Sequence, residues 1–262
     1  MKKNKNLFLC FLSFVICVPL FAQDYLREYT PKTNFKYKAK AFSVSSTNKV
    51  YFTQGNLIVQ NSYSSKLAFA THQYDVFYPH TTTAWEGYHL FVSTQDYFFS
   101  SSDIENTNKQ NTIKYRCLSV EEFEYLLEKR TNAHNLQSFA RVNGTVGYIL
   151  LPDNWTCPAN ITFVPMATCS DPSNPWVYTN TYENEEWEKM EAVGAVFLPI
   201  NYFNVYGSSI VMAGIYWTKT SLQQSLVQPA LFMFLHNQLP YCKPIPRGTS
   251  EKAAIRLVYD VK

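Results

Sequence analysis

The chain has 262 residues, of which 46% are hydrophobic and 16% are charged, a composition that excludes an intrinsically disordered protein. It is long enough to bury the core of one large domain or of two small ones. Its formal net charge of +3 falls to zero without Lys2, Lys3 and Lys5, because 23 minus 3 leaves 20 Lys and Arg against 20 Asp and Glu. A neutral chain has no overall field that would attract phosphates, so we expect no nucleic acid partner.

The first residues predict a secretory signal peptide over residues 1–22. A basic head is followed by the uncharged apolar run Leu7 to Phe21 and by Ala22, a small residue at the cleavage site. The run is shorter than the ~20 apolar residues of a transmembrane helix, and no small residue precedes Cys10 or Cys17, as a lipid anchor requires. We therefore expect an exported protein without a transmembrane segment, either periplasmic, on the outer cell surface or secreted. Residues 23–40 are expected to be a polar leader, and residues 41–262 a single domain.

Strand-like patterns begin at about residue 42. The alternation from Val50 to Gln54 is followed by the turn pair Gly55-Asn56, and a second strand is predicted at Leu57 to Val59. Lys66 to Ala70 has the pattern of a short partner strand.

The best local prediction is a helix from Ser119 to Arg130. Ser119 and Glu122 have the spacing of a capping box, in which a hydroxyl and a carboxylate satisfy free backbone N–H groups reciprocally. Apolar residues then recur on one face, and the glutamates between them point away from it. The acidic side chains from Glu121 to Glu128, and those from Glu183 to Glu191 further along the chain, are interpreted as solvated helix surface.

A second helix is predicted from about Asn184 to Val193. Trp187 and Met190 give it an apolar stripe, and Gly194 can adopt the left-handed conformation that ends a helix. Strands are predicted at Val146–Leu151, Ala195–Leu198, Ile210–Thr218, Ala230–Leu235 and Ala254–Val261. Two helices, a mixed sheet and long irregular loops favour an α+β domain.

The longest stretch without a predicted element is Phe77 to Thr112. It holds Trp85, Tyr88 and Tyr97 among Ser, Thr, Asn and Asp, and Trp176 lies in a second loop of similar composition. An exposed aromatic ring can stack on the apolar face of a sugar while neighbouring polar groups bind its hydroxyls, so these four residues are the candidate ligand-binding residues. The alternative is that they cover the core beneath long loops.

The remaining chemistry is sparse. Cys157 and Cys169 are the pair with the shortest loop for a structural disulfide, and the alternative is buried free thiols. His72, Asp75, His80 and His89 are grouped, but their spacing matches no metal site. We find no serine on a glycine elbow and no phosphate-binding glycine loop, so no catalytic residue, metal or cofactor is predicted.

Several phrases in fixed order carry a family resemblance over about residues 42–262. They are Phe42-Ser43-Val44-Ser45, Phe52-Thr53-Gln54-Gly55-Asn56-Leu57, Tyr115-Arg116-Cys117-Leu118-Ser119, Leu151-Pro152-Asp153-Asn154-Trp155, Trp187-Glu188-Lys189-Met190-Glu191, Gly194-Ala195-Val196-Phe197-Leu198-Pro199, Gly214-Ile215-Tyr216-Trp217-Thr218 and Ile255-Arg256-Leu257-Val258. Together they resemble a group of secreted Bacteroidetes proteins that are similar to the Fibrobacter major paralogous domain and to domains with the C-type-lectin-like or sulfatase-modifying-factor fold.

The resemblance implies a twisted, partly split sheet with two helices around it, and amino-terminal and carboxyl-terminal strands that lie together. It implies no metal here, because the calcium motifs of C-type lectins are missing and Cys242 has no neighbouring cysteine for copper. The phrase Gly-Trp-Gly, usual in this group, is missing as well, and His89-Leu90-Phe91-Val92-Ser93 lies in that neighbourhood.

These observations favour a non-enzymatic cell-surface binding or adhesion protein that recognises a glycan or a protein partner. One alternative is a hydrolase or modifying enzyme whose catalytic residues converge only in three dimensions. Another is a structural, fimbria-associated subunit whose leader pairs with the sheet edge of another chain.

Overall fold

The structure, a computed structural model, describes residues 40–59, 67–75, 98–100, 104, 113–168, 170, 177–206, 209–222, 228–235, 245–246 and 253–261. All of them belong to one compact unit, Pro31–Lys262, and the other unit, Met1–Thr30, lies outside the described residues. The predicted signal peptide and all but the last residue of the predicted leader therefore lie outside them too, and both stay predictions.

A five-stranded sheet joins the two ends of the described chain. Its strands in spatial order are β1 (Phe42–Ser43), β2 (Lys49–Phe52), β15 (Val258–Asp260), β6 (Lys114–Arg116) and β5 (Phe98–Ser100). Val258 of β15 pairs with Phe52 on one side and with Arg116 on the other, antiparallel in both cases. The Thr53 hydroxyl donates to the Leu257 carbonyl (3.0 Å) across 204 positions of the sequence. The first and last described strands thus meet in one sheet, an arrangement that the resemblance implies.

A four-stranded sheet holds the second group of strands. In spatial order they are β10 (Val196–Pro199), β8 (Thr145–Leu150), β7 (Gln137–Val142) and β9 (Thr181–Tyr182). Asn143 and Gly144 join β7 to β8 with φ values of +45° and +81°, the left-handed conformation that a tight hairpin turn requires. Gly147 of β8 lies so close to β10 that a Cβ atom there would be 2.6 Å from the Leu198 carbonyl oxygen.

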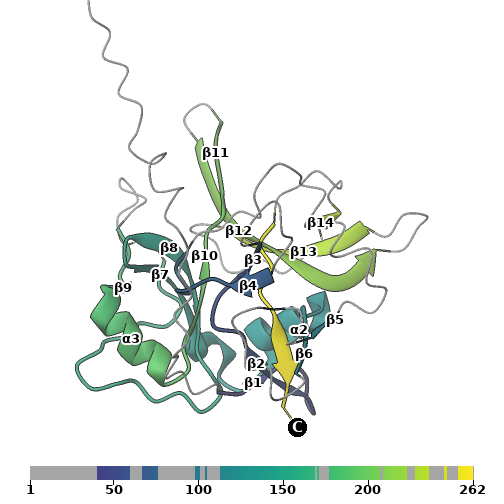
Figure 1. Ribbon diagram of the computed structural model, residues 1–262. Helices are drawn as coiled ribbons and strands as arrows, with labels where there is room; N and C mark the ends of the chain where they lie inside the picture. Colours follow the sequence, from purple (N-terminus) through teal and green to yellow (C-terminus); the bar gives the residue numbers. More distant parts are fainter. Residues whose placement is uncertain are drawn as a thin grey trace, which may run out of the picture. The chain divides into compact units, whose positions relative to one another are not determined.

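The other strands form a second four-stranded sheet and a separate pair (Figure 1). The sheet consists of β11 (Tyr202–Tyr206), β12 (Ser209–Leu222), β13 (Gln228–Leu235) and β14 (Ile245–Pro246), and the pair of β3 (Leu57–Val59) and β4 (Leu67–Phe69). The pairing of β12 with β13 is irregular between Trp217 and Ser221. In this interval the Lys219 backbone N–H donates instead to the Leu118 carbonyl (2.9 Å), so β12 runs beside the start of the first helix.

The first predicted helix begins as expected. It consists of α2 (Val120–Glu124) and a π-helix (Tyr125–Lys129), and a 3-10 helix (Ala133–Leu136) follows. The capping box is confirmed, because the Ser119 Oγ accepts from the Glu122 backbone N–H (3.1 Å) and Glu122 Oε2 accepts from the Ser119 backbone N–H (2.8 Å). The π-helix was not predicted; it ends with the Arg130 backbone N–H donating to the Tyr125 carbonyl (2.9 Å).

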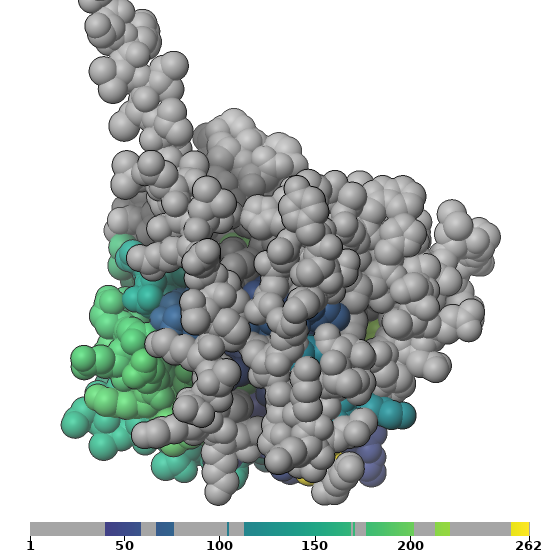
Figure 2. All heavy atoms as spheres, in the orientation of Figure 1, coloured from purple at the N-terminus to yellow at the C-terminus, as the bar shows by residue number. Residues whose placement is uncertain are grey.

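The second predicted helix is α3 (Asn184–Ala192). Its apolar stripe is confirmed, since Trp187 and Met190 are both buried and the Trp187 ring lies 5.6 Å from that of Phe197 on β10. Gly194 ends the helix region with a φ of +99°, as predicted. Figure 1 shows α3 beside β9, and the green atoms at the left of the surface in Figure 2 include this helix.

Three clusters of buried side chains form the described core. The largest contains Phe42 of β1 and Phe123 of α2, together with residues of β2, β7, β8, β10, β12 and β15. The second includes Trp217 of β12, and the third lies under α3 and includes Trp187. Both tryptophans were predicted to be core residues, and this is confirmed; Trp155, also predicted there, is partly buried against the third cluster.

Three predictions about the strands need correction. The strands do not form one mixed sheet; in the described residues they form separate sheets, in which only β7 and β9 pair in parallel. The final strand is β15 rather than Ala254–Val261. The residues before it are buried, and their backbone groups form hydrogen bonds with several different segments instead of with one partner strand. The stretch Phe77–Thr112 is not free of structure, since β5 lies within it and Ile104 forms a bridge with Leu67. These pairings are backbone contacts between segments distant in sequence, which local periodicity does not report.

No helix among the described residues has both the length and the apolar character needed to cross a membrane.

Candidate functional site

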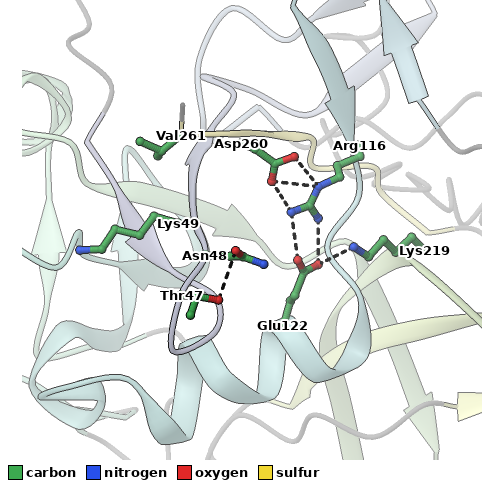
Figure 3. Close-up of a pocket in the computed structure, with 8 residues that line it drawn as sticks. All are labelled: Thr47, Asn48, Lys49, Arg116, Glu122, Lys219, Asp260 and Val261. Carbon is green, nitrogen blue, oxygen red and sulfur yellow. Dashed lines mark hydrogen bonds and ion pairs between the residues drawn. The ribbon is translucent and has the colours of Figure 1, made fainter.

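A polar pocket of about 400 Å³ lies at one end of the inner strands β2, β15 and β6 of the five-stranded sheet, and Figure 3 shows the residues around it. They come from the β1–β2 turn and the start of β2, from β6, α2 and β12, and from the end of β15, and comprise Thr47, Asn48, Lys49, Arg116, Glu122, Lys219, Asp260 and Val261. The capping box fixes Glu122, and the irregular pairing of β12 brings Lys219 to α2. The pocket therefore depends on pairings between five separate segments.

The guanidinium of Arg116 lies at the centre of this pocket (Figure 3). Its Nη1 and Nη2 donate to the two carboxylate oxygens of Glu122 at 2.8 and 2.9 Å, a bidentate pair. Nη2 also donates to Asp260 Oδ1 (2.6 Å), Nε lies 3.2 Å from the same oxygen, and Nη1 donates to the Cys117 carbonyl (3.2 Å). Arg116 is 6% exposed, so these partners replace the water that its charge would otherwise bind.

The charges around the pocket are balanced largely among themselves. Burial alone would lower the pKa of Arg116, but the hydrogen bonds and charges of Asp260 and Glu122 outweigh it and raise this pKa above its ordinary value. Lys219 Nζ lies 3.1 Å from Glu122 Oε2. Lys49 is turned away from the other charged groups in Figure 3, and its Nζ pairs with Asp153 Oδ2 (3.0 Å).

The rim of the pocket presents hydrogen-bonding groups to solvent. The side chains of Asp260 and Lys219 are 59% and 35% exposed, and Thr47 and Asn48 are exposed residues of the β1–β2 turn. The rim thus offers a carboxylate, an ammonium, a hydroxyl and an amide. Such a set can bind a polar ligand, and it contains no thiol or imidazole for nucleophilic chemistry.

A second polar cluster lies where α3 meets β10. Gln73, 1% exposed, donates through Nε2 to Glu191 Oε1 and to the Ala195 carbonyl, both at 3.0 Å, and its Oε1 accepts from the Phe197 backbone N–H (2.8 Å). Burial raises the pKa of Glu191, although hydrogen bonds from Gln73 and Gln54 and the charge of Arg256 oppose this. The prediction that the helix glutamates are all solvated is therefore wrong for Glu191, and also for Glu122.

The candidate ligand-binding residues Trp85, Tyr88, Tyr97 and Trp176 all lie outside the described residues and stay predictions. The residues just before the stretch that holds the first three are described, and so is a short segment within it. Before it the His72 backbone N–H donates to Asp75 Oδ2 (2.9 Å), and within it β5 pairs with β6.

The grouped histidines and acids do not form a metal site in the part that the structure describes. His72 Nδ1 lies 3.4 Å from Asp75 Oδ2, and its ring stacks on that of Tyr74 with centroids 4.9 Å apart. His80 and His89 lie outside the described residues, and within those residues no three His, Cys, Asp or Glu side chains are grouped to hold a metal ion.

The predicted disulfide is not tested. Cys157 is an exposed free cysteine whose Sγ lies 3.3 Å from the Ile161 carbonyl oxygen, and Cys169 lies outside the described residues. Cys117 is buried and free, and burial raises the pKa of its thiol, which makes it a weak nucleophile.

Sequence reasoning missed the pocket. It identified Glu122 as a helix cap but not as a partner of Arg116, although Arg116 stands in one of the phrases that carry the resemblance. The spacing of six residues between Arg116 and Glu122 was the one local signal. Asp260 is 144 positions from Arg116, and no periodicity links them.

Comparison with known proteins gives no match to a family model, a curated protein or a solved structure.

Proposed function

We propose that the mature chain is an exported, non-enzymatic binding protein of C-type-lectin-like type that recognises a glycan with the stretch Phe77–Thr112. The observation that supports this proposal best is the anchoring of that stretch. Before it, Asp75 closes a hydrogen-bonded turn, and within it Phe98–Ser100 pair with β6 next to the central strand β15. A segment that follows a hydrogen-bonded turn and pairs with a sheet within its own length suits recognition, because a rigid scaffold lowers the entropic cost of ordering a binding loop.

The finer fold assignment rests on three features taken together. They are the pairing of β2 with β15, the two helices with their order along the chain, and the division of the strands among several sheets. These features agree with the family resemblance over residues 42–262, and they support a C-type-lectin-like domain more specifically than an α+β composition does.

The chemistry of the stretch supports a sugar ligand. Trp85, Tyr88 and Tyr97 supply aromatic faces, and Thr81, Thr82 and Thr83 stand beside them in the sequence with hydroxyl groups. Aromatic faces pack on the apolar face of a pyranose, and hydroxyls and amides bind its edges. The balance of charges in the mature chain suits a neutral ligand.

The test is glycan-array binding of the exported protein and of three single variants. Trp85→Ala and Tyr97→Ala should each weaken binding about fivefold, because one aromatic stacking contact is worth about 1 kcal/mol. Val164→Ala is the matched control, since Val164 is an exposed hydrophobic residue of the described scaffold and should leave binding unchanged. Binding that persists in both aromatic variants would remove this stretch from the proposal, and absence of any glycan signal would contradict glycan recognition itself.

A further inference from the structure

We infer that the pocket beside β15 binds a neutral, hydroxyl-rich ring, that is, a single sugar unit. None of the residues that line this pocket belongs to the stretch Phe77–Thr112, although Phe98 of that stretch pairs with Arg116. The pocket shares only the class of ligand with the proposed function, and it depends on different residues. The inference rests on which polar groups of the pocket already form hydrogen bonds or ion pairs within the protein and which are exposed to solvent.

The buried arginine cannot serve as an anion receptor. Arg116 gives its N–H groups to Glu122, Asp260 and the Cys117 carbonyl, at distances from 2.6 to 3.3 Å. A phosphate or carboxylate ligand would have to displace one of two carboxylates, or lie against it. An anion would therefore meet repulsion at the floor of the pocket, and its binding is disfavoured.

A cationic ligand is disfavoured for a different reason. The carboxylate of Glu122 is shared between Arg116 and Lys219, so its charge is already neutralised, and the Lys219 ammonium lies 3.1 Å from it. The lining residues carry three cations, Lys49, Arg116 and Lys219, against two carboxylates. Asp153 pairs with Lys49 outside the pocket and leaves the site close to neutral.

The groups on the rim suit vicinal hydroxyls. The Asp260 carboxylate can accept further hydrogen bonds, and the Lys219 ammonium can donate them. The Thr47 hydroxyl donates to Asn48 Oδ1 and lies near the Ser45 hydroxyl, but both contacts are long (3.4 Å) and exposed, so a ligand hydroxyl can replace them and use the Asn48 amide and the Thr47 hydroxyl as donors and acceptors. A sugar hydroxyl donates one hydrogen bond and accepts others, so adjacent hydroxyls satisfy a carboxylate and an ammonium or amide at once. A volume of about 400 Å³ is in the range of small-ligand pockets and is large enough for one monosaccharide.

The experiment records amide NMR spectra of the full exported protein during titration with D-glucose, D-galactose, D-mannose and N-acetyl-D-glucosamine. At least one of these sugars should shift the signals of Asn48, Lys219 and Val261 with a dissociation constant in the millimolar range, whereas sodium phosphate should not. Asp260→Asn and Asn48→Ala should each weaken this binding about fivefold through loss of a hydrogen bond. The second variant changes only an exposed turn residue, so it keeps the test valid if Asp260→Asn fails to fold.

Glu121→Gln is the matched control. It makes the same carboxylate-to-amide change on an exposed residue next to Glu122 and should leave the titration unaltered. If no sugar of the panel shifts the three signals, or if phosphate shifts them equally, the inference is wrong. If the shifts are lost in Trp85→Ala and kept in Asn48→Ala and Asp260→Asn, the sugar binds at the aromatic stretch, which overturns this inference and leaves the proposed function intact.

Discussion

Arg130 shows how a buried charge can hold a loop in place. It is 3% exposed, and its guanidinium donates to the carbonyls of Leu151 (2.9 Å) and Leu136 (3.3 Å). Burial lowers its pKa to about 10, and the neighbouring carboxylate of Asp153 opposes this, so Arg130 remains charged at neutral pH. It also lies over the Phe42 ring, with Cζ 5.7 Å from the centroid.

Replacing Arg130 should be costly. Arg130→Met fills part of the volume but leaves two buried carbonyls without their donor, so the free energy of unfolding should fall by about 3 kcal/mol. Urea denaturation measures this change. Lys129→Met is the matched control: its side chain is 63% exposed, and it should change stability by less than about 0.5 kcal/mol. Equal effects of the two variants would show that the contacts of Arg130 contribute nothing.

Glu191 should make stability depend on pH in an unusual direction. Because burial raises the folded-state pKa of this carboxyl, the folded protein holds its proton more tightly than the unfolded chain does. Stability is then greatest below the unfolded pKa of about 4.3 and falls as pH rises through the folded value. Glu191→Gln should therefore be more stable than the parent at pH 7, and the gain should disappear near pH 4.

Denaturation at both pH values checks this prediction. Glu188→Gln is the control on the same helix, because Glu188 is exposed, and it should change stability by less than about 0.5 kcal/mol at either pH. A stability gain of Glu191→Gln that is equally large at pH 4 would contradict the assigned cause.

At the scale of elements, the contact between β8 and β10 depends on one glycine. A methyl group on Gly147 would meet the Phe197 ring and lie 2.6 Å from the Leu198 carbonyl oxygen, so one strand would have to move. Gly144 is a useful contrast, since it has a φ of +81° and a Cβ atom added there would have no neighbouring atom within 4 Å.

Gly147→Ala should therefore destabilise the protein more than Gly144→Ala does. We expect a loss of about 3 kcal/mol for the first, from overpacking between strands, and of about 1 kcal/mol for the second, from the left-handed backbone alone. Thermal or urea unfolding of both variants measures the difference. The reverse order would mean that β8 and β10 can separate freely.

The helices could be predicted because their signals are local. Ser119 and Glu122 lie three positions apart, and Trp187, Met190 and Gly194 lie within one short segment. The pair Asn143-Gly144 was an equally local signal for the β7–β8 hairpin, and it was overlooked. Strands such as β5 and β6, with three residues each, have no periodicity to detect and are defined only by their partners.

At the scale of the whole molecule, the two described cysteines should differ in reactivity. Cys117 is 1% exposed and its thiol has a raised pKa, whereas Cys157 is exposed. In reducing buffer, iodoacetamide should therefore modify Cys157 in the folded protein and Cys117 only after unfolding in urea. Peptide mass mapping reads out both sites, and rapid modification of Cys117 in the folded protein would contradict its burial.

The same mapping tests the predicted disulfide. In protein recovered from an oxidising compartment, a linked peptide that contains Cys157 and Cys169 should replace the modified Cys157 peptide. A Cys157 that stays fully reactive in that sample would contradict the pairing.

The pocket could not have been predicted at this scale. Its floor joins Arg116 to Asp260 across 144 positions, and Lys219 enters only because β12 breaks its pairing with β13 there. The sequence supplies every one of these side chains, but only the assembled sheet brings them together. The aromatic stretch differs from the pocket, because its aromatic residues can be identified from the sequence alone. Its candidate residues lie outside the described part of the chain.

The central place of β15 bears on how the protein is made. This strand lies between β2 and β6, yet the ribosome synthesises it after every other described strand. The five-stranded sheet therefore cannot close before the ribosome has made Val258–Asp260, because its middle position is empty until then. For a chain that is exported, as proposed above, this delay favours passage through a secretion pore, because the sheet has not yet formed when the preceding segments are made.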